Sequence, residues 1–110
     1  MTKKVTINVR MYKNGEVILK EVDGAEEIKI DCCPAERFFV HKAIDIKGWT
    51  LTESKTGLAV VRDIRTRSEC IEKAKTAIVD WGVLRFLGQI DVVVEKYGYA
   101  NEEVRNGQIN

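Results

Sequence analysis

The sequence of 110 residues lacks a large charge of either sign. It holds 18 Lys and Arg against 17 Asp and Glu, which leaves a formal net charge of +1. Non-specific nucleic-acid binding depends on neutralising many phosphates, so this chain is not expected to coat DNA or RNA. It also has no uninterrupted stretch of about 18 apolar residues and no apolar run after its first four residues, which predicts neither a membrane span nor a signal peptide. We expect a cytoplasmic protein.

Residues that carry catalysis or bind metals are scarce as well. Cys32, Cys33 and Cys70 include an adjacent pair that cannot form an ordinary disulfide, and their spacing is not that of a zinc site. His41 is the only histidine and has no carboxylate or cysteine at a motif spacing, which favours a strand-surface or core-edge histidine over a general base. No serine stands in a nucleophile elbow, and no glycine-rich phosphate loop is present. The sequence therefore predicts no enzyme, no cofactor and no metal site.

What the sequence does contain is a series of alternating segments over its first 65 residues. Apolar residues alternate over residues 5–11, Lys13-Asn14-Gly15 carries the Asn-Gly signal of a tight hairpin, and residues 17–22 supply the returning strand. After Asp23-Gly24, a further alternation over residues 28–32 predicts a third strand.

Residues 35–44 fit either a helix or a strand. Aromatic and β-branched residues cluster at Phe38-Phe39-Val40, and for that reason we favour a strand. Residues 49–51 and 58–64 then form a second hairpin around Thr56-Gly57.

Two helices are predicted after this sheet. Thr66 and Glu69 have the spacing of a capping box, and the apolar residues that follow share one helix face up to Gly82. That face comprises Ile71, Ala74, Ile78 and Trp81. The second helix carries a stripe of Val83, Phe86, Leu87, Ile90, Val94 and Tyr97 and ends at Gly98. The chain is therefore expected to form one α+β domain, with an N-terminal antiparallel β-sheet of about five strands (residues 1–65), two C-terminal helices (66–98) and a polar tail (99–110).

The second helix has more apolar surface than one small sheet can cover. Val92 and Val93 fall beside its main stripe, and this excess predicts self-association into a homo-oligomer. The tail is polar from Asn101 onward and is expected to be loose unless a partner or ligand orders it.

The one place where residue chemistry suggests a ligand is the entrance to the first helix. Arg62, Arg65 and Arg67 surround it, and a helix N-terminus favours anions through its N–H groups and its dipole. Arginines add bidentate donors for phosphate. A ββα unit with positive charge at its helix entrance predicts a phosphate-binding site, although the same arginines also suit a solvated turn.

Several stretches of the chain resemble a family of small phage proteins, the Thoeris anti-defence sponges. The resemblance rests on Phe39-Val40-His41-Lys42-Ala43, on the Trp-led hairpin of residues 48–60 and on Thr66-Arg67-Ser68 at the helix start. It implies an N-terminal antiparallel sheet, C-terminal helices and symmetric oligomers. It also implies that the protein sequesters a cyclic nucleotide immune signal, a cyclic ADP-ribose isomer, between protomers without cleaving it; some members also hold cyclic oligonucleotides.

Such a site needs a stacking surface, donors for ribose and pyrophosphate, and no nucleophile. The ligand-binding residues predicted on this basis are Arg62, Arg65, Arg67, Phe86, Tyr99, Asn101 and Asn106, with Arg65 and Arg67 on phosphate. Two other classes stay open. A small nucleic-acid-binding protein would show steep salt dependence, and a host-protein inhibitor would dock its second helix or its first strand on a host polypeptide.

Overall fold

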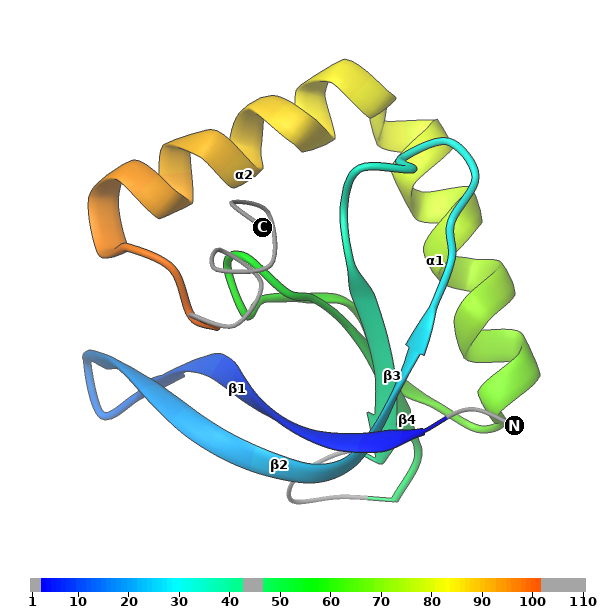
Figure 1. Ribbon diagram of the computed structural model, residues 1–110, viewed down its shortest axis with the longest axis horizontal. Helices are drawn as coiled ribbons and strands as arrows, with labels where there is room; N and C mark the ends of the chain where they lie inside the picture. The colour runs from blue at the N-terminus through cyan, green and yellow to red at the C-terminus, as the bar shows by residue number, and fades with distance from the viewer. Residues whose placement is uncertain (1–2, 43–46, 102–110) are drawn as a thin grey trace.

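The computed structural model describes residues 3–42 and 47–101, which form one antiparallel sheet followed by two helices (Figure 1). The strands are β1 (Lys4–Lys13), β2 (Glu16–Ile28), β3 (Phe38–Lys42), β4 (Trp49–Glu53) and β5 (Ala59–Ile64), and the helices are α1 (Arg67–Trp81) and α2 (Val83–Tyr97). Each strand pairs with the next one in the chain, so the sheet order is β1-β2-β3-β4-β5. The predicted α+β fold is confirmed.

The first hairpin turns where the Asn-Gly signal predicts. Asn14 has a φ of 52° and Gly15 a φ of 81°, and positive φ at both central residues is what a type I′ turn requires. This turn has the same twist as the strands that it joins, so β1 and β2 pair along most of their length.

Asp23-Gly24, which precedes the predicted third strand, forms a β-bulge within β2. Asp23-Gly24 stands opposite the single residue Thr6, and the positive φ of Gly24, 74°, accommodates the extra residue. The Thr6 hydroxyl donates to Asp23 Oδ1 at 2.7 Å across the bulge. The separate strand predicted over residues 28–32 is therefore wrong, because β2 continues through the bulge and ends at Ile28.

β3 is buried on both of its faces. Phe38 and Val40 belong to the larger core beneath the helices, whereas Phe39 packs on the opposite face. Its neighbours there are Ile7, Val9 and Ala25. The strand interpretation of residues 35–44 is thus confirmed over 38–42, and residues 43–46 lie outside the described part of the chain. The two cores require the sheet to curl, so that the β1–β2 hairpin covers one face of β3 and α1 covers the other (Figure 1).

The helix boundaries follow the predicted caps. Thr66 Oγ1 accepts from the Glu69 backbone N–H at 3.2 Å and so caps α1. Gly82, with a φ of 107°, ends α1 and directly precedes α2, which confirms the end predicted for the first helix. Figure 1 shows α1 lying along the sheet and α2 crossing from its end toward the tip of the β1–β2 hairpin.

The buried face of α2 follows the predicted stripe at Val83, Phe86, Leu87, Ile90 and Val94 and departs from it at Val93 and Tyr97. Its buried residues are Phe86, Ile90 and Val93, so Val93 faces inward rather than beside the stripe. Val92 and Tyr97 are exposed, at 56% and 45%. Val93 faces the same cavity as Leu58 and Ala59, so the buried side of α2 is turned toward the β4–β5 hairpin.

Residues 98–101, which we term the latch, are tied to the sheet. The Asn101 amide accepts from Asn8 N–H at 2.8 Å and donates to the carbonyls of Asn8 and Ser54 at 3.1 and 2.8 Å. The Ala100 N–H donates to Lys55 O at 2.8 Å. The expectation of a loose tail from Asn101 onward is therefore wrong for Asn101, because the latch bridges β1 and the β4–β5 turn; residues 102–110 lie outside the described part of the chain.

Candidate functional site

A groove of about 500 Å³ opens between β1 and β5, the two edge strands of the curled sheet. Its floor is formed by His41, Thr50 and Thr52, which share one face of β3 and β4 because His41 pairs with Thr50. Arg10, Tyr12, Arg62 and Tyr97 stand among the other lining residues. This volume lies in the range of small-molecule sites, roughly 300 to 1,000 Å³. The groove therefore combines cations, aromatic rings and hydroxyls in one concave surface.

The floor is a fixed polar layer. His41 Nδ1 lies 2.8 Å from Lys42 O, and since a carbonyl only accepts, Nδ1 carries the proton. His41 Nε2 then accepts from the Thr52 hydroxyl at 2.8 Å. Burial lowers the pKa of His41 below its ordinary value of 6.5, and the hydrogen bond to Lys42 opposes that shift. The ring is consequently a neutral, positioned group at neutral pH.

Arg10 is held in place at one end of the groove. Its Nε donates to Thr56 O at 2.8 Å and its Nη2 donates to Gly98 O at 3.0 Å. The guanidinium lies 5.4 Å from the centre of the Tyr97 ring, within cation–π range. Arg10 thus joins β1, the β4–β5 turn and the latch, and it fixes the Tyr97 ring at the groove wall.

Arg62 is the cation of the groove that is available to a ligand. It is exposed on β5 and forms no ion pair or hydrogen bond with any other residue that the structure describes. The adjacent Asp63 has a φ of 63°, an uncommon conformation for a residue other than glycine, at an irregular part of the β4–β5 pairing. Tyr12, 75% exposed, lines the groove from β1.

The other predicted arginines lie apart from the groove. Arg65 is exposed and pairs with Glu69 at 3.4 Å, one helical turn away. Arg67 pairs with Glu26 of β2 at 3.4 Å. Neither lines the groove, so the structure separates Arg65 and Arg67 from Arg62, although all three lie close together in sequence.

The remaining predicted residues lie in three different surroundings. Phe86 is 7% exposed, and its ring packs in the core 6.1 Å from the Phe38 ring. Asn101 is buried in the latch with its amide fully engaged, and Tyr99 is half-buried in the same segment. Asn106 lies outside the described residues. Of the six predicted residues that the structure describes, the groove contains Arg62 alone.

A second cavity, which we term the chamber, lies beneath the junction of α1 and α2. It measures about 300 Å³ and is mainly apolar, with Ile78, Trp81, Phe86 and Ile90 among its walls. The chamber and the groove share Leu58, Ala59 and Val93. The two cavities are therefore neighbours on either side of these three residues.

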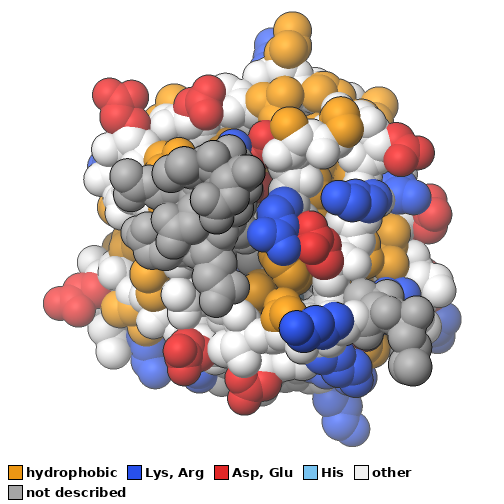
Figure 2. Space-filling view, in the orientation of Figure 1, with side chains coloured by type: hydrophobic (Ala, Val, Ile, Leu, Met, Phe, Trp, Pro, Cys, Tyr) orange, Lys and Arg blue, Asp and Glu red, His pale blue; other side chains and the backbone are white. Residues whose placement is uncertain are grey.

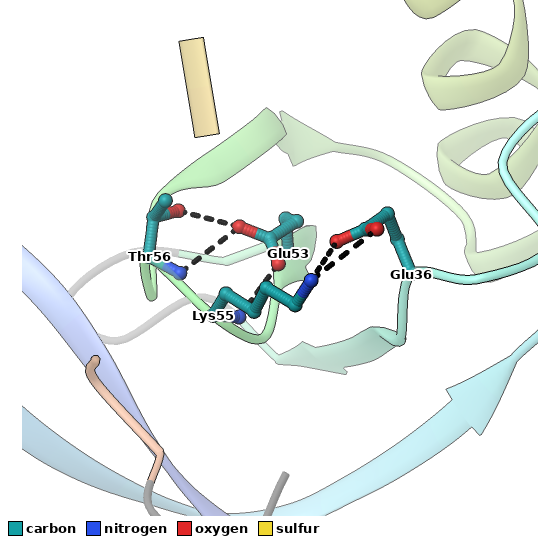
Figure 3. A network of polar contacts seen from close by, with 4 residues as sticks. All are labelled: Glu36, Glu53, Lys55 and Thr56. Carbon is teal, nitrogen blue, oxygen red and sulfur yellow. Dashed lines mark hydrogen bonds and ion pairs between the residues drawn. The ribbon is translucent and has the colours of Figure 1, made fainter. Parts of the chain in front are cut away.

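A buried polar network lies at the base of the chamber (Figure 3). Glu53 Oε1 accepts from the N–H and hydroxyl of Thr56 at 3.0 and 2.7 Å, and Oε2 accepts from Lys55 N–H at 2.6 Å. The Lys55 ammonium turns the other way and pairs with Glu36 Oε1 at 3.1 Å. Burial raises the pKa of Glu53, and the hydrogen bonds from Thr56 and Lys55 partly offset that shift. The carboxylate fixes the β4–β5 turn from which Gly57 reaches β1.

Sequence reasoning missed most of the groove. The alternating pattern assigned no role to Arg10, Thr50 and Thr52, because it does not show which strands face one another. The signal that could have found them is the pair Thr50-x-Thr52 on the opposite face from Leu51, combined with the pairing of β3 and β4.

Comparison with protein-family models, curated proteins and solved structures found no match to this chain. Within residues 3–42 and 47–101, no three His, Cys, Asp or Glu side chains are grouped so as to hold a metal ion. In the same part of the chain, neither helix is long and apolar enough to cross a membrane. The groove itself is thus the main guide to function.

Proposed function

We propose that this protein binds a phosphate-bearing cyclic nucleotide in the groove and holds it without cleaving it. The observation that carries the proposal is the meeting of an available arginine, Arg62, with two tyrosines, Tyr12 and Tyr97, over a hydroxyl-bearing floor. In the biological setting that the sequence resemblance suggests, this is a phage anti-defence protein that sequesters a cyclic ADP-ribose-type immune signal.

The chemistry of the groove suits such a ligand in three ways. An arginine donates two parallel hydrogen bonds to phosphate oxygens. Tyrosine rings offer flat surfaces on which a base stacks, worth about 1 to 3 kcal/mol per base. The floor of His41, Thr50 and Thr52 is buried and is fixed by the hydrogen bond between the Thr52 hydroxyl and His41 Nε2, so it gives the groove a rigid polar base. Capture alone needs no nucleophile or general base.

Self-association accompanies this proposal. Large apolar side chains are exposed on the two helices, among them Leu84 at 84%, Val79 at 61% and Val92 at 56%. Figure 2 shows apolar side chains gathered over the upper part of the molecule, where α2 and the end of α1 lie. Apolar surface of this kind supports a homo-oligomer in which α2 meets a second copy of the chain.

The test is a pair of arginine substitutions measured by isothermal titration with cyclic ADP-ribose and with cyclic di- and trinucleotides. Arg62→Ala removes a charged hydrogen-bonding group, worth about 1.5 to 3 kcal/mol, and so weakens binding by roughly 10- to 100-fold. Arg65→Ala is the matched control, since Arg65 is also exposed but lies outside the groove, and it should leave the affinity within about twofold.

Three outcomes would overturn the proposal. The first is that Arg65→Ala or Arg67→Ala abolishes binding while Arg62→Ala does not, because the site would then lie at the N-terminus of α1. The second is a nucleotide recovered in a hydrolysed form after incubation, which would make the protein an enzyme. Absence of binding to every nucleotide, with capture of a host protein or of RNA instead, would favour the other two classes.

A further inference from the structure

The volume and lining of the chamber suit a second ligand site, separate from the groove. Its walls come from both helices and from the β4–β5 hairpin, and its volume of about 300 Å³ is twice that of an engineered cavity of about 150 Å³ that binds benzene. The apolar lining suits a ring, and Trp81 and Phe86 offer aromatic contacts.

The charges at the base of the chamber do not balance. Glu53 and Glu36 are both buried, at 1% and 9% exposure, and Lys55 is the one cation that bonds to either of them in the described part of the chain. The Lys55 ammonium pairs with Glu36, so Glu53 receives only neutral donors from Lys55 and Thr56. One carboxylate is therefore without a countercharge beneath an apolar cavity.

We propose that the chamber binds a small aromatic ring that carries an amidinium or primary ammonium group. The ring lies among Ile78, Phe86 and Ile90, and the cation faces the Glu53 carboxylate, whose Oε2 accepts a single hydrogen bond in the structure. A cation there offsets the cost of a buried, unpaired carboxylate, which is what distinguishes this ligand from a neutral one of the same shape.

The probes are benzamidine and benzamide, which have nearly the same shape but differ in charge. Binding is followed through the indole N–H resonances of the two tryptophans in a 15N-labelled sample. Trp81 lines the chamber and should shift, whereas Trp49 lies outside both cavities and should not. We expect benzamidine to bind at least tenfold more tightly than benzamide.

Two substitutions locate the site. Ala77→Leu adds three carbons to the chamber wall and should abolish binding of both probes, and Thr76→Leu, the neighbouring exposed position of α1, is its control. Glu53→Gln should make the affinities for benzamidine and benzamide equal. If that variant does not fold, Ala77→Leu and its control Thr76→Leu still show whether the probes bind in the chamber. Equal affinities in the unmodified protein, shifts at Trp49 alone, no binding at millimolar concentration, or binding that survives Ala77→Leu would each overturn the proposal.

Discussion

Replacing Asn101 separates a structural role for this residue from a role in ligand binding. Its amide is buried and makes three hydrogen bonds, to both backbone groups of Asn8 and to Ser54 O. Each such bond contributes about 1 kcal/mol, so Asn101→Ala should lower the free energy of unfolding by about 3 kcal/mol. A loss of that size is a large part of the stability of a small domain, typically about 5 to 15 kcal/mol.

Asn101→Asp makes the prediction sharper because it preserves size and shape. An aspartate can still accept from Asn8 N–H, but at neutral pH it turns a second oxygen toward the carbonyls of Asn8 and Ser54, where the amide donates. It should therefore cost at least as much as alanine. Asn8→Ala, which removes only the side-chain bond to Ala100 O, should cost about 1 kcal/mol.

Urea denaturation followed by circular dichroism measures all three variants. We expect the wild type to be the most stable, followed by Asn8→Ala and then by Asn101→Ala. Asn101→Asp should be as unstable as Asn101→Ala or less stable. A loss below about 0.5 kcal/mol for Asn101→Ala, or an aspartate variant as stable as the wild type, would refute the role assigned to the latch.

Three further predictions follow from single positions. Gly57→Ala should destabilise the protein by more than about 2 kcal/mol in urea denaturation, because φ is +73° there and a Cβ would lie 2.7 Å from Ala100 Cβ; Gly15→Ala, at a φ of +81° with open space around it, is the milder control. Thr66→Ala should cost about 1 kcal/mol through loss of the α1 cap, measured by thermal unfolding, and no loss would show the cap to be unimportant. The pKa of His41 is lower folded than unfolded, so its contribution to stability is present above pH 6.5 and is lost as pH falls through the folded pKa; an NMR titration that gave a pKa above 6.5 would contradict the buried, neutral ring.

Local signals in the sequence predicted the elements whose causes are local. The turn at Asn14-Gly15 and the cap at Thr66 each depend on a few neighbouring residues, and both formed as expected. Asp23-Gly24 was misread for a physical reason, since a glycine with positive φ serves a bulge as well as a turn. Only pairing with β1 distinguishes the two.

The candidate site could not be read from the sequence because long-range contacts assemble it. The groove exists because β1 and β5, at opposite edges of the sheet, curl toward each other, with Arg10 N–H bonded to Gly57 O at 2.7 Å. Asn101 reaches Asn8 across a separation of 93 residues. No spacing along the chain records either contact, so Arg10 went unnoticed and Asn101 was predicted to contact a ligand.

The most direct test of ligand capture is native mass spectrometry of the purified protein, with and without a mixture of cyclic ADP-ribose isomers and cyclic di- and trinucleotides. We predict a homo-oligomer that gains a discrete nucleotide mass, loses this adduct in the Arg62→Ala variant and releases the nucleotide unaltered on denaturation. A bare monomer with no adduct, or a nucleotide released in cleaved form, would contradict the account.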